Sequence, residues 1–333
     1  MYMKRVASAG LAVALAVGGG VMAGAQQRGG ARVQQPEPPP TVPAVPAPRI
    51  PLAPAPVRGA SVTPALEGWF QNPDGTFTIL VGYRNRNQNQ TFDVPVGPNN
   101  SIEPGGPDYG QPTRFDLGRH YGVFSLTVPK DFGTKRLTYT INVNNQPQTI
   151  TLGLPSGYQI SPFRRNDTGN TPPVVKLDPS GPEYQGPPRG AAKTLSATVG
   201  QSITLPLYVT DKGATINQSA SPTTPAADGA VTTGRGQRGG ITVRWYKHRG
   251  PAGETVKFEP ASPMLVNDPE PAKLFEKPGD RTGKATTTAT FTTAGEYWLR
   301  AQISDGSQLD EQCCWSTVLI KVDAQASAGS KGP

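Results

Sequence analysis

Short runs of alternating apolar and polar residues recur along the chain from about residue 66 onward, each bounded by turn residues. Residues 122–128 read Gly-Val-Phe-Ser-Leu-Thr-Val, and residues 137–143 read Leu-Thr-Tyr-Thr-Ile-Asn-Val. A period of two places successive side chains on opposite faces of a strand, and no segment shows the period of a helix. Asn144 and Asn145 then favour a hairpin turn into the next strand. The pattern predicts an all-β fold.

The predicted strands fall into two groups. In the first group we expect strands at residues 76–83, 91–96, 122–128, 137–143 and 148–152. In the second group we expect seven strands, which begin near Leu195, Ser202, Ile241, Val256, Ala285, Glu296 and Trp315. Short strands at this spacing are typical of a sandwich or barrel. The sequence therefore predicts two immunoglobulin-like β-sandwich modules, at residues 63–164 and 193–323.

Proline and glycine, with 37 and 39 residues, gather outside these groups. Proline lacks a backbone N–H and fixes φ, so it interrupts helices and sheet ladders. We expect residues 26–62 to be a disordered, Pro-rich spacer, either a stalk of polyproline II or a remnant without a role. Residues 165–192 are expected to form a semi-rigid, Pro-rich linker. A mobile insertion is expected at about 211–240, and a disordered tail at 324–333.

The first 25 residues have the pattern of a secretory signal peptide. Lys4 and Arg5 precede an apolar run, which ends in the small residues Ala23-Gly24-Ala25. The run is short for a membrane span, although an uncleaved anchor is the rival interpretation. No cysteine follows it to carry a lipid. The sequence predicts an exported protein, periplasmic, cell-surface or secreted, without a transmembrane segment after cleavage.

The formal net charge of +8 is spread along the chain, with Lys and Arg interleaved among Asp and Glu. A diffuse positive excess favours weak attraction to anionic envelope polymers. Binding of nucleic acid requires a basic patch or a motif in addition, and the sequence has neither. Nucleic acid is therefore excluded as an expected partner.

Four residues are expected to build the core of the second module. Trp245 takes the place of the buried tryptophan on the third strand of an immunoglobulin sandwich, and Tyr297 that of the tyrosine before the sixth strand. Leu205 and Leu299 take the places of the cystine that links the two sheets of such domains. The core then depends on apolar burial alone.

Both modules resemble known groups of proteins. The second resembles the polycystic-kidney-disease-type (PKD) and related Ig-like repeats of surface proteins, at superfamily level, since the W-D-F-G-D-G signature is missing. The matching residues are Trp245, Arg249-Gly-Pro251, residues 289–297 (Ala-Thr-Phe-Thr-Thr-Ala-Gly-Glu-Tyr) and Ile303-Ser-Asp-Gly306. This resemblance implies an extracellular spacer or binding module rather than an enzyme.

The first module resembles a group of uncharacterised exported bacterial proteins, which implies no activity. The segments that carry this resemblance are Glu67-Gly-Trp-Phe, Val81-Gly-Tyr-Arg-Asn-Arg-Asn, Asp93-Val-Pro-Val-Gly-Pro, Pro104-Gly-Gly-Pro-Asp and Val128-Pro-Lys-Asp-Phe-Gly.

The sequence contains no motif for catalysis or cofactor binding. The two histidines, His120 and His248, sit among charged neighbours and are expected to be solvated. The motifs H-E-x-x-H, G-x-S-x-G and G-x-x-x-x-G-K are absent, so no catalytic, cofactor or metal residue is assigned. Asp211 and Asp305 follow strands at one end of the second module, where a structural calcium ion is the weaker interpretation and a turn role the stronger.

The only two cysteines, Cys313 and Cys314, are adjacent. In an oxidising compartment they are predicted to form a vicinal disulfide just before the last strand. Two free thiols, a redox switch and an intermolecular bridge remain as alternatives.

Three functions are compatible with these observations. The first is a non-catalytic exported binding or scaffold protein, whose partner is an anionic polymer, a polysaccharide or another surface protein. The second is a carbohydrate-binding or other accessory module for a separate enzyme, which an exposed row of Trp69, Tyr83 and Tyr109 would favour. The third is a hydrolase with a loop-built site, because carboxylates from distant strands leave no motif.

Overall fold

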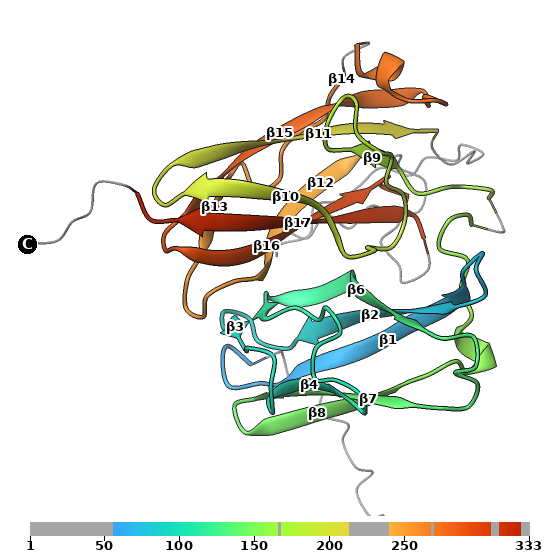
Figure 1. The fold of residues 1–333 in the computed structure, drawn as a ribbon, viewed down its shortest axis with the longest axis vertical. Coiled ribbons are helices and arrows are strands. Elements are labelled where there is room, and N and C mark those ends of the chain that lie inside the picture. The colour runs from blue at the N-terminus through green and yellow to red at the C-terminus, as the bar shows by residue number, and fades with distance from the viewer. Residues whose placement is uncertain (1–55, 166–167, 213–239, 268–269, 308–312, 328–333) are drawn as a thin grey trace, which may run out of the picture. The chain divides into compact units, whose positions relative to one another are not determined.

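The computed structural model describes residues 56–165, 168–212, 240–267, 270–307 and 313–327 (Figure 1). The predicted signal peptide, most of the spacer and most of the insertion at 211–240 lie outside the described residues. The described residues belong to one compact unit. The described part contains only strands and two short 3-10 helices, η1 (Ser156–Tyr158) and η2 (Glu270–Leu274), so the all-β prediction is confirmed.

The first sandwich consists of two three-stranded sheets that share one apolar core. One sheet has the order β1-β2-β6, with β1 (Val62–Gln71), β2 (Phe77–Asn85) and β6 (Gly118–Val128). The other has the order β4-β7-β8, with β4 (Asn100–Glu103), β7 (Leu137–Val143) and β8 (Gln146–Leu152). A small ribbon pairs β3 (Phe92–Asp93) with β5 (Arg114–Phe115).

Alternation along the strands explains this packing. In β7 every second residue, from Leu137 to Val143, is buried, whereas the residues between them are exposed or half-buried. Asn144 and Asn145 have φ of 52° and 56°, the left-handed conformation that a two-residue hairpin between β7 and β8 requires. The hairpin predicted from the sequence is therefore present.

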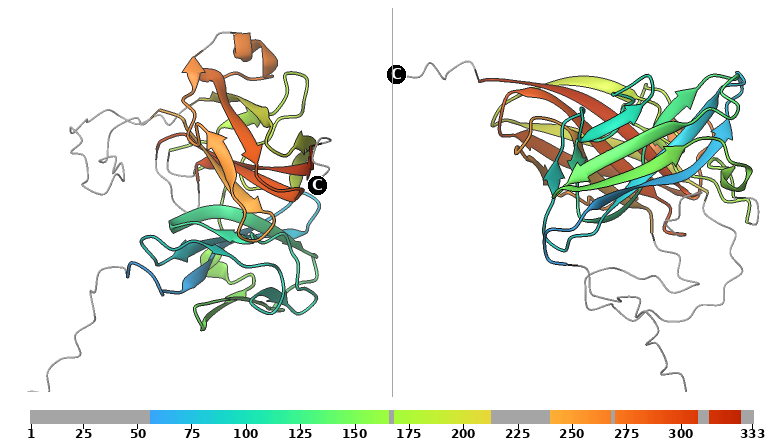
Figure 2. Two further views of the ribbon diagram at one scale, coloured as in Figure 1. Left: turned by 90° about the vertical axis from the view of Figure 1, so that its left-hand side faces the viewer. Right: turned by 90° about the horizontal axis from the view of Figure 1, so that it is seen from below.

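The second sandwich also has two sheets around one core (Figures 1 and 2). One has the order β10-β17-β16-β12, with β10 (Ala191–Thr198), β17 (Trp315–Gln325), β16 (Gly295–Ser304) and β12 (Thr242–Arg249). The other has the order β13-β15-β11-β9, with β13 (Val256–Glu259), β15 (Arg281–Phe291), β11 (Ser202–Asp211) and β9 (Val174–Lys176), while β14 (Val266–Asn267) also pairs with β15. Strand β17 extends into the predicted tail.

The predicted linker contributes to the second sandwich. Strand β9 pairs antiparallel with β11, and Val175 forms a further bridge with Tyr184. Val175 and Leu177 are buried in the core. The prediction of a linker over the whole of 165–192 is therefore wrong. A strand of three residues between prolines is too short to show a period of its own.

The two sandwiches are packed against each other. In β16 the residues from Leu299 to Ser304 are all buried, and in β17 so are those from Trp315 to Ile320. One face of each strand points into its own core, and on the other face Arg300, Gln302 and Trp315 contact the first sandwich. A separate apolar cluster joins Phe70, Leu80 and Ile160 to Trp315.

Candidate functional site

The polar centre of the contact between the sandwiches begins with His120 on β6. Its Nε2 lies 3.0 Å from the Leu117 carbonyl oxygen, to which it donates. Its Nδ1 therefore carries the lone pair, and it accepts a hydrogen bond from Arg300 Nη2 on β16 at 3.2 Å. The ring stacks on Tyr83 with centroids 4.8 Å apart. His120 thus joins the two sandwiches in its neutral form.

His248 on β12 makes the reciprocal connection. Its Nε2 lies 3.0 Å from the carbonyl oxygen of Gly110, and its own carbonyl accepts from Thr113 N at 2.9 Å. The side chains of His248 and His120 are buried, at 1% and 6% exposure, so the prediction that both are solvated is wrong. Their charged sequence neighbours point elsewhere, to partners of their own.

Arg300 is the central cation of this contact and is 2% exposed. Its guanidinium carbon lies 4.5 Å from the centre of the Tyr246 ring, a cation–π contact. Nε and Nη1 have no hydrogen-bond partner among the described residues. The guanidinium is thus packed against aromatic and imidazole rings, with a neutral His120 as its acceptor.

Burial and Arg300 together keep both histidines neutral. Desolvation is the larger cause, and the charge of Arg300 the next, of a decrease in the pKa of His120 from 6.5 to about 3. The same two causes lower the pKa of His248 to about 3. We call the set His120, His248, Tyr246 and Arg300 the joint.

Ion pairs close the joint on one side. Lys247 Nζ on β12 lies 2.9 Å from Asp93 Oδ1 on β3, and their side chains are 6% and 10% exposed. The same ammonium donates to the carbonyls of Pro251 and Glu254 at 2.8 and 2.7 Å. All three of its protons therefore have an acceptor.

Arg249 holds the proline-rich loop of the first sandwich. Its Nη1 and Nη2 lie 3.1 and 2.6 Å from the two carboxylate oxygens of Asp108, and its Nε donates to the Gln111 carbonyl at 2.7 Å. Such a two-pronged pair fixes orientation as well as distance. The hydrogen bond from Arg249 is the largest cause of a lowered pKa of Asp108.

The four predicted core residues of the second sandwich are buried. Trp245 and Leu205 are 3% and 2% exposed, and Tyr297 and Leu299 are fully buried. The Tyr297 hydroxyl donates to the carbonyl of Thr293 at 2.9 Å, the bond expected of a tyrosine at this corner.

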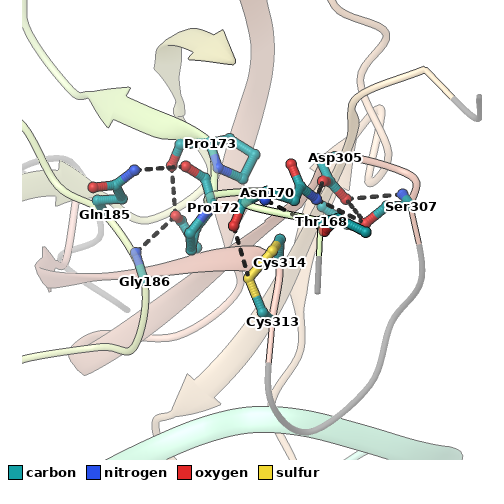
Figure 3. Close-up of a disulfide and its surroundings, with 12 residues drawn as sticks. Thr168, Asn170, Pro172, Pro173, Gln185, Gly186, Asp305, Ser307, Cys313 and Cys314 are labelled. Atoms are coloured by element: carbon teal, nitrogen blue, oxygen red, sulfur yellow. Dashed lines mark hydrogen bonds between the residues drawn. A yellow bond between two sulfur atoms is a disulfide. The ribbon is translucent and has the colours of Figure 1, made fainter. Parts of the chain in front are cut away.

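The structure joins Cys313 and Cys314 in a vicinal disulfide, directly before β17 (Figure 3). Both residues are buried, and Cys313 Sγ lies 4.0 Å from the Asn170 carbonyl oxygen. The side chain of Asn170 donates to Asp305 and Ser307. The pair therefore lies where residues near 170 meet the turn after β16.

Asp211 and Asp305 lie at one end of the second sandwich, and Arg281 connects them. Its Nη2 is paired with the Asp211 carboxylate, while Nη1 donates to the backbone carbonyl of Asp305 at 3.0 Å. Within the described ranges, no three His, Cys, Asp or Glu side chains are grouped as metal ligands. The Arg281 guanidinium thus lies between Asp211 and Asp305.

Trp69, Tyr83 and Tyr109 do not form the exposed row that would favour a carbohydrate-binding module. Tyr83 is 2% exposed, in the first core, and Trp69 Nε1 donates to the Pro155 carbonyl at 2.8 Å. Tyr109 donates its hydroxyl to the Pro104 carbonyl at 2.9 Å within its own loop. All three side chains therefore make contacts within the first sandwich.

Two adjoining hollows lie on the second sandwich, and Glu183 and Gln185 line both. One, of about 410 Å³, is also lined by Phe163, Tyr184, Arg189 and Thr317. The other, of about 270 Å³, is also lined by Asp211, Lys212, Glu276 and Lys277. Their walls mix aromatic, amide and charged groups of both signs.

Comparison with known proteins does not place the chain in a family. No protein-family model and no curated protein sequence matches it. No helix in the described part of the chain has the length and apolar character needed to span a bilayer.

Three solved structures show a weak likeness. Domains 4 and 5 of the S-layer protein SbsC are 11% identical, with 80% of this chain and 98% of that chain covered and a TM-score of 0.20. A protein of unknown function from Porphyromonas gingivalis W83 is 9% identical, with 79% and 100% covered and a TM-score of 0.19. The adhesin InvE of Yersinia pseudotuberculosis is 12% identical, with 79% and 58% covered and a TM-score of 0.19. Scores of this size do not establish a shared fold.

Proposed function

We propose that the protein is a non-catalytic, exported binding or scaffold protein of the cell envelope or extracellular space, built from two Ig-like sandwiches that act as one rigid body. The observation that carries this proposal is the contact between the sandwiches. Buried histidines, an arginine, a cation paired to Asp93 and a bidentate Arg249–Asp108 pair all hold one sandwich to the other. Such an arrangement supports a protein that holds the outer surface of one sandwich at a fixed distance from that of the other.

The polar groups themselves support a structural role. A general base or nucleophile needs an exposed position next to a space for substrate. Both histidines are enclosed by protein, and the carboxylates of Asp93 and Asp108 are paired to Lys247 and Arg249. The parallel pairing of β10 with β17 and the Tyr297 corner support the Ig-like assignment of the second sandwich.

Capture from fractionated cell envelope tests this proposal. The immobilised full chain is expected to retain a surface protein or an anionic or neutral polysaccharide and to leave it chemically unchanged. Polysaccharide chain length, measured after incubation, provides the second readout. Shortening of the polymer would contradict the proposal and favour the hydrolase.

The adjoining hollows favour a carbohydrate-binding accessory module as the second candidate. Polar groups beside an aromatic side chain suit a sugar, and the exposed Arg189 lies over the Phe163 ring at 5.3 Å. Affinity electrophoresis in polysaccharide gels tests it, with Arg189→Ala expected to weaken retardation. Arg84→Ala, an exposed arginine on β2, is the matched control and should bind as the parent does.

A further inference from the structure

The only two histidines of the chain both connect the two sandwiches. His120 belongs to the first sandwich and accepts from Arg300 of the second. His248 belongs to the second and donates to the carbonyl of Gly110 in the first. The bonds fix the tautomer of each ring, with the proton on Nε2 and the lone pair on Nδ1.

A proton added to His120 has to bind at Nδ1, because Nε2 already carries one. That position accepts from Arg300 Nη2 at 3.2 Å, so protonation removes the hydrogen bond and places two cations in contact. Neither charge can be hydrated there, because both side chains are buried. The contact between β6 and β16 then changes from attractive to repulsive.

The hydrogen bond to the Leu117 carbonyl favours protonation of His120, but the side chains packed against the ring carry no negative charge. Tyr83 of β2 stacks on the ring, and Tyr246 of β12 meets it edge-on with centroids 5.1 Å apart. The charges that act on it, Arg300, Arg119 and Arg244, are all positive and all oppose protonation.

His248 is in a similar position. Arg300 and Arg249 oppose its protonation, while the hydrogen bond to Gly110 and the charge of Asp108 favour it less strongly. Asp108 is itself neutralised by Arg249. Protonation of His248 therefore adds a third positive charge to the buried joint.

We propose that acid opens the joint, so that protonation of His120 and His248 separates the two sandwiches while each keeps its own core. The two cores are separate clusters of buried residues, which allows the contact between them to break alone. Above pH 6.5 the histidines are neutral in both states, and pH has no effect through them. Below pH 6.5 the two histidines bind protons in the open state. In the closed state they stay neutral until about pH 3, so acid favours the open state.

The size of the effect follows from this difference. Over that window each histidine shifts the closed-to-open equilibrium by up to about tenfold per pH unit, and both together by up to about a hundredfold. Asp108 stays ionised over the upper part of the window, because Arg249 holds its pKa below 3.8. Between pH 6.5 and 4.5 the Asp108–Arg249 pair therefore stays charged while the histidines respond to acid.

Small-angle scattering of the full chain across this range tests the proposal. The radius of gyration is expected to rise as the pH falls, while the far-UV circular dichroism of the strands stays constant. The double variant His120→Asn, His248→Gln keeps an acceptor towards Arg300 and a donor towards Gly110 but does not titrate. The double variant should remain compact down to pH 4.5. The single variant Arg300→Met should open at a lower pH than the parent, because one of the charges that oppose protonation is removed.

A parent chain that stays compact at pH 4.5, or a double variant that expands at the same pH, would overturn the proposal. Should the variants fail to fold, the parent itself decides. Its two imidazole signals in NMR are expected to titrate together, in the same step as the expansion. Protonation of both rings without expansion would show that the histidines do not control the contact.

Discussion

The indole of Trp315 occupies the space that a β-carbon on Gly122 would need. Gly122 lies on β6 of the first sandwich with φ of 54°, and Trp315 opens β17 of the second. The close approach of the sandwiches therefore depends on the absence of a side chain at one position.

Gly122→Ala is expected to destabilise the folded protein by about 1–3 kcal/mol more than the control Gly118→Ala, because the new methyl overlaps the indole. Gly118 lies on the same strand, also with positive φ (81°), and has nothing within 4 Å of an added β-carbon. Backbone strain is thus present in both variants, and the difference reports the contact. Urea denaturation provides the measurement, and equal losses would contradict the tight fit of Trp315.

Asp93→Asn should cost about 3–5 kcal/mol of unfolding free energy, because it leaves the ammonium of Lys247 buried without its counter-charge. The control is Asp131→Asn, which breaks the exposed Lys135–Asp131 pair, whose side chains are 62% and 77% exposed. That change should cost at most about 1 kcal/mol. Similar small losses in both variants would mean that the Lys247–Asp93 pair is hydrated in solution.

Trp245→Ala should reduce the unfolding free energy by about 3–5 kcal/mol, because it leaves a cavity in the second core. Trp298, half-buried on the outer face of β16, is the matched control, and its replacement by Ala should cost clearly less. Chemical denaturation compares the two. A loss well under about 1 kcal/mol for Trp245→Ala would contradict its burial.

Trypsin should not cleave the native protein after Lys176, because this residue is 8% exposed and lies in β9. Its ammonium also donates to the Leu274 carbonyl at 2.8 Å. Mass spectrometry of the digest identifies the cleaved bonds. Cleavage after Lys176 is expected only once the protein is unfolded in urea. Rapid cleavage at this bond in the native state would support a free linker instead.

Intact mass of protein recovered from the export compartment tests the disulfide. Alkylation should add nothing before reduction and two groups afterwards, because Cys313 and Cys314 are the only cysteines. Two reactive thiols without reductant, or a covalent dimer, would contradict the vicinal bond.

The periodicity of the sequence predicted most of the strands, because a residue that faces the core of its own sandwich has to be apolar. All seven strands expected in the second sandwich are present, and their order along the chain agrees. Tyr297 and Leu299 are buried for the same reason, since they alternate with outward residues along β16.

The contact between the sandwiches could not be predicted in this way. Arg300 occupies an outward position of an alternating strand, and such a residue is ordinarily solvated. The charged neighbours of His120 indicate a solvated position, yet Arg119 is paired with the buried Glu67 and the imidazole itself is buried. The sequence of β17 does indicate a second buried face. Residues 315–320 carry apolar side chains at inward and at outward positions alike, with Trp315 and Leu319 on the outward face.

The position of β17 has a consequence for the order of events during synthesis. Ribosomes make chains from the N-terminus, so all strands of the first sandwich exist long before the last strand of the second. Until that strand arrives, Phe70 and Leu80 have no Trp315 to cover them. A half-made chain therefore leaves these apolar side chains without the cover that they have in the finished protein, and apolar surface exposed in this way favours aggregation.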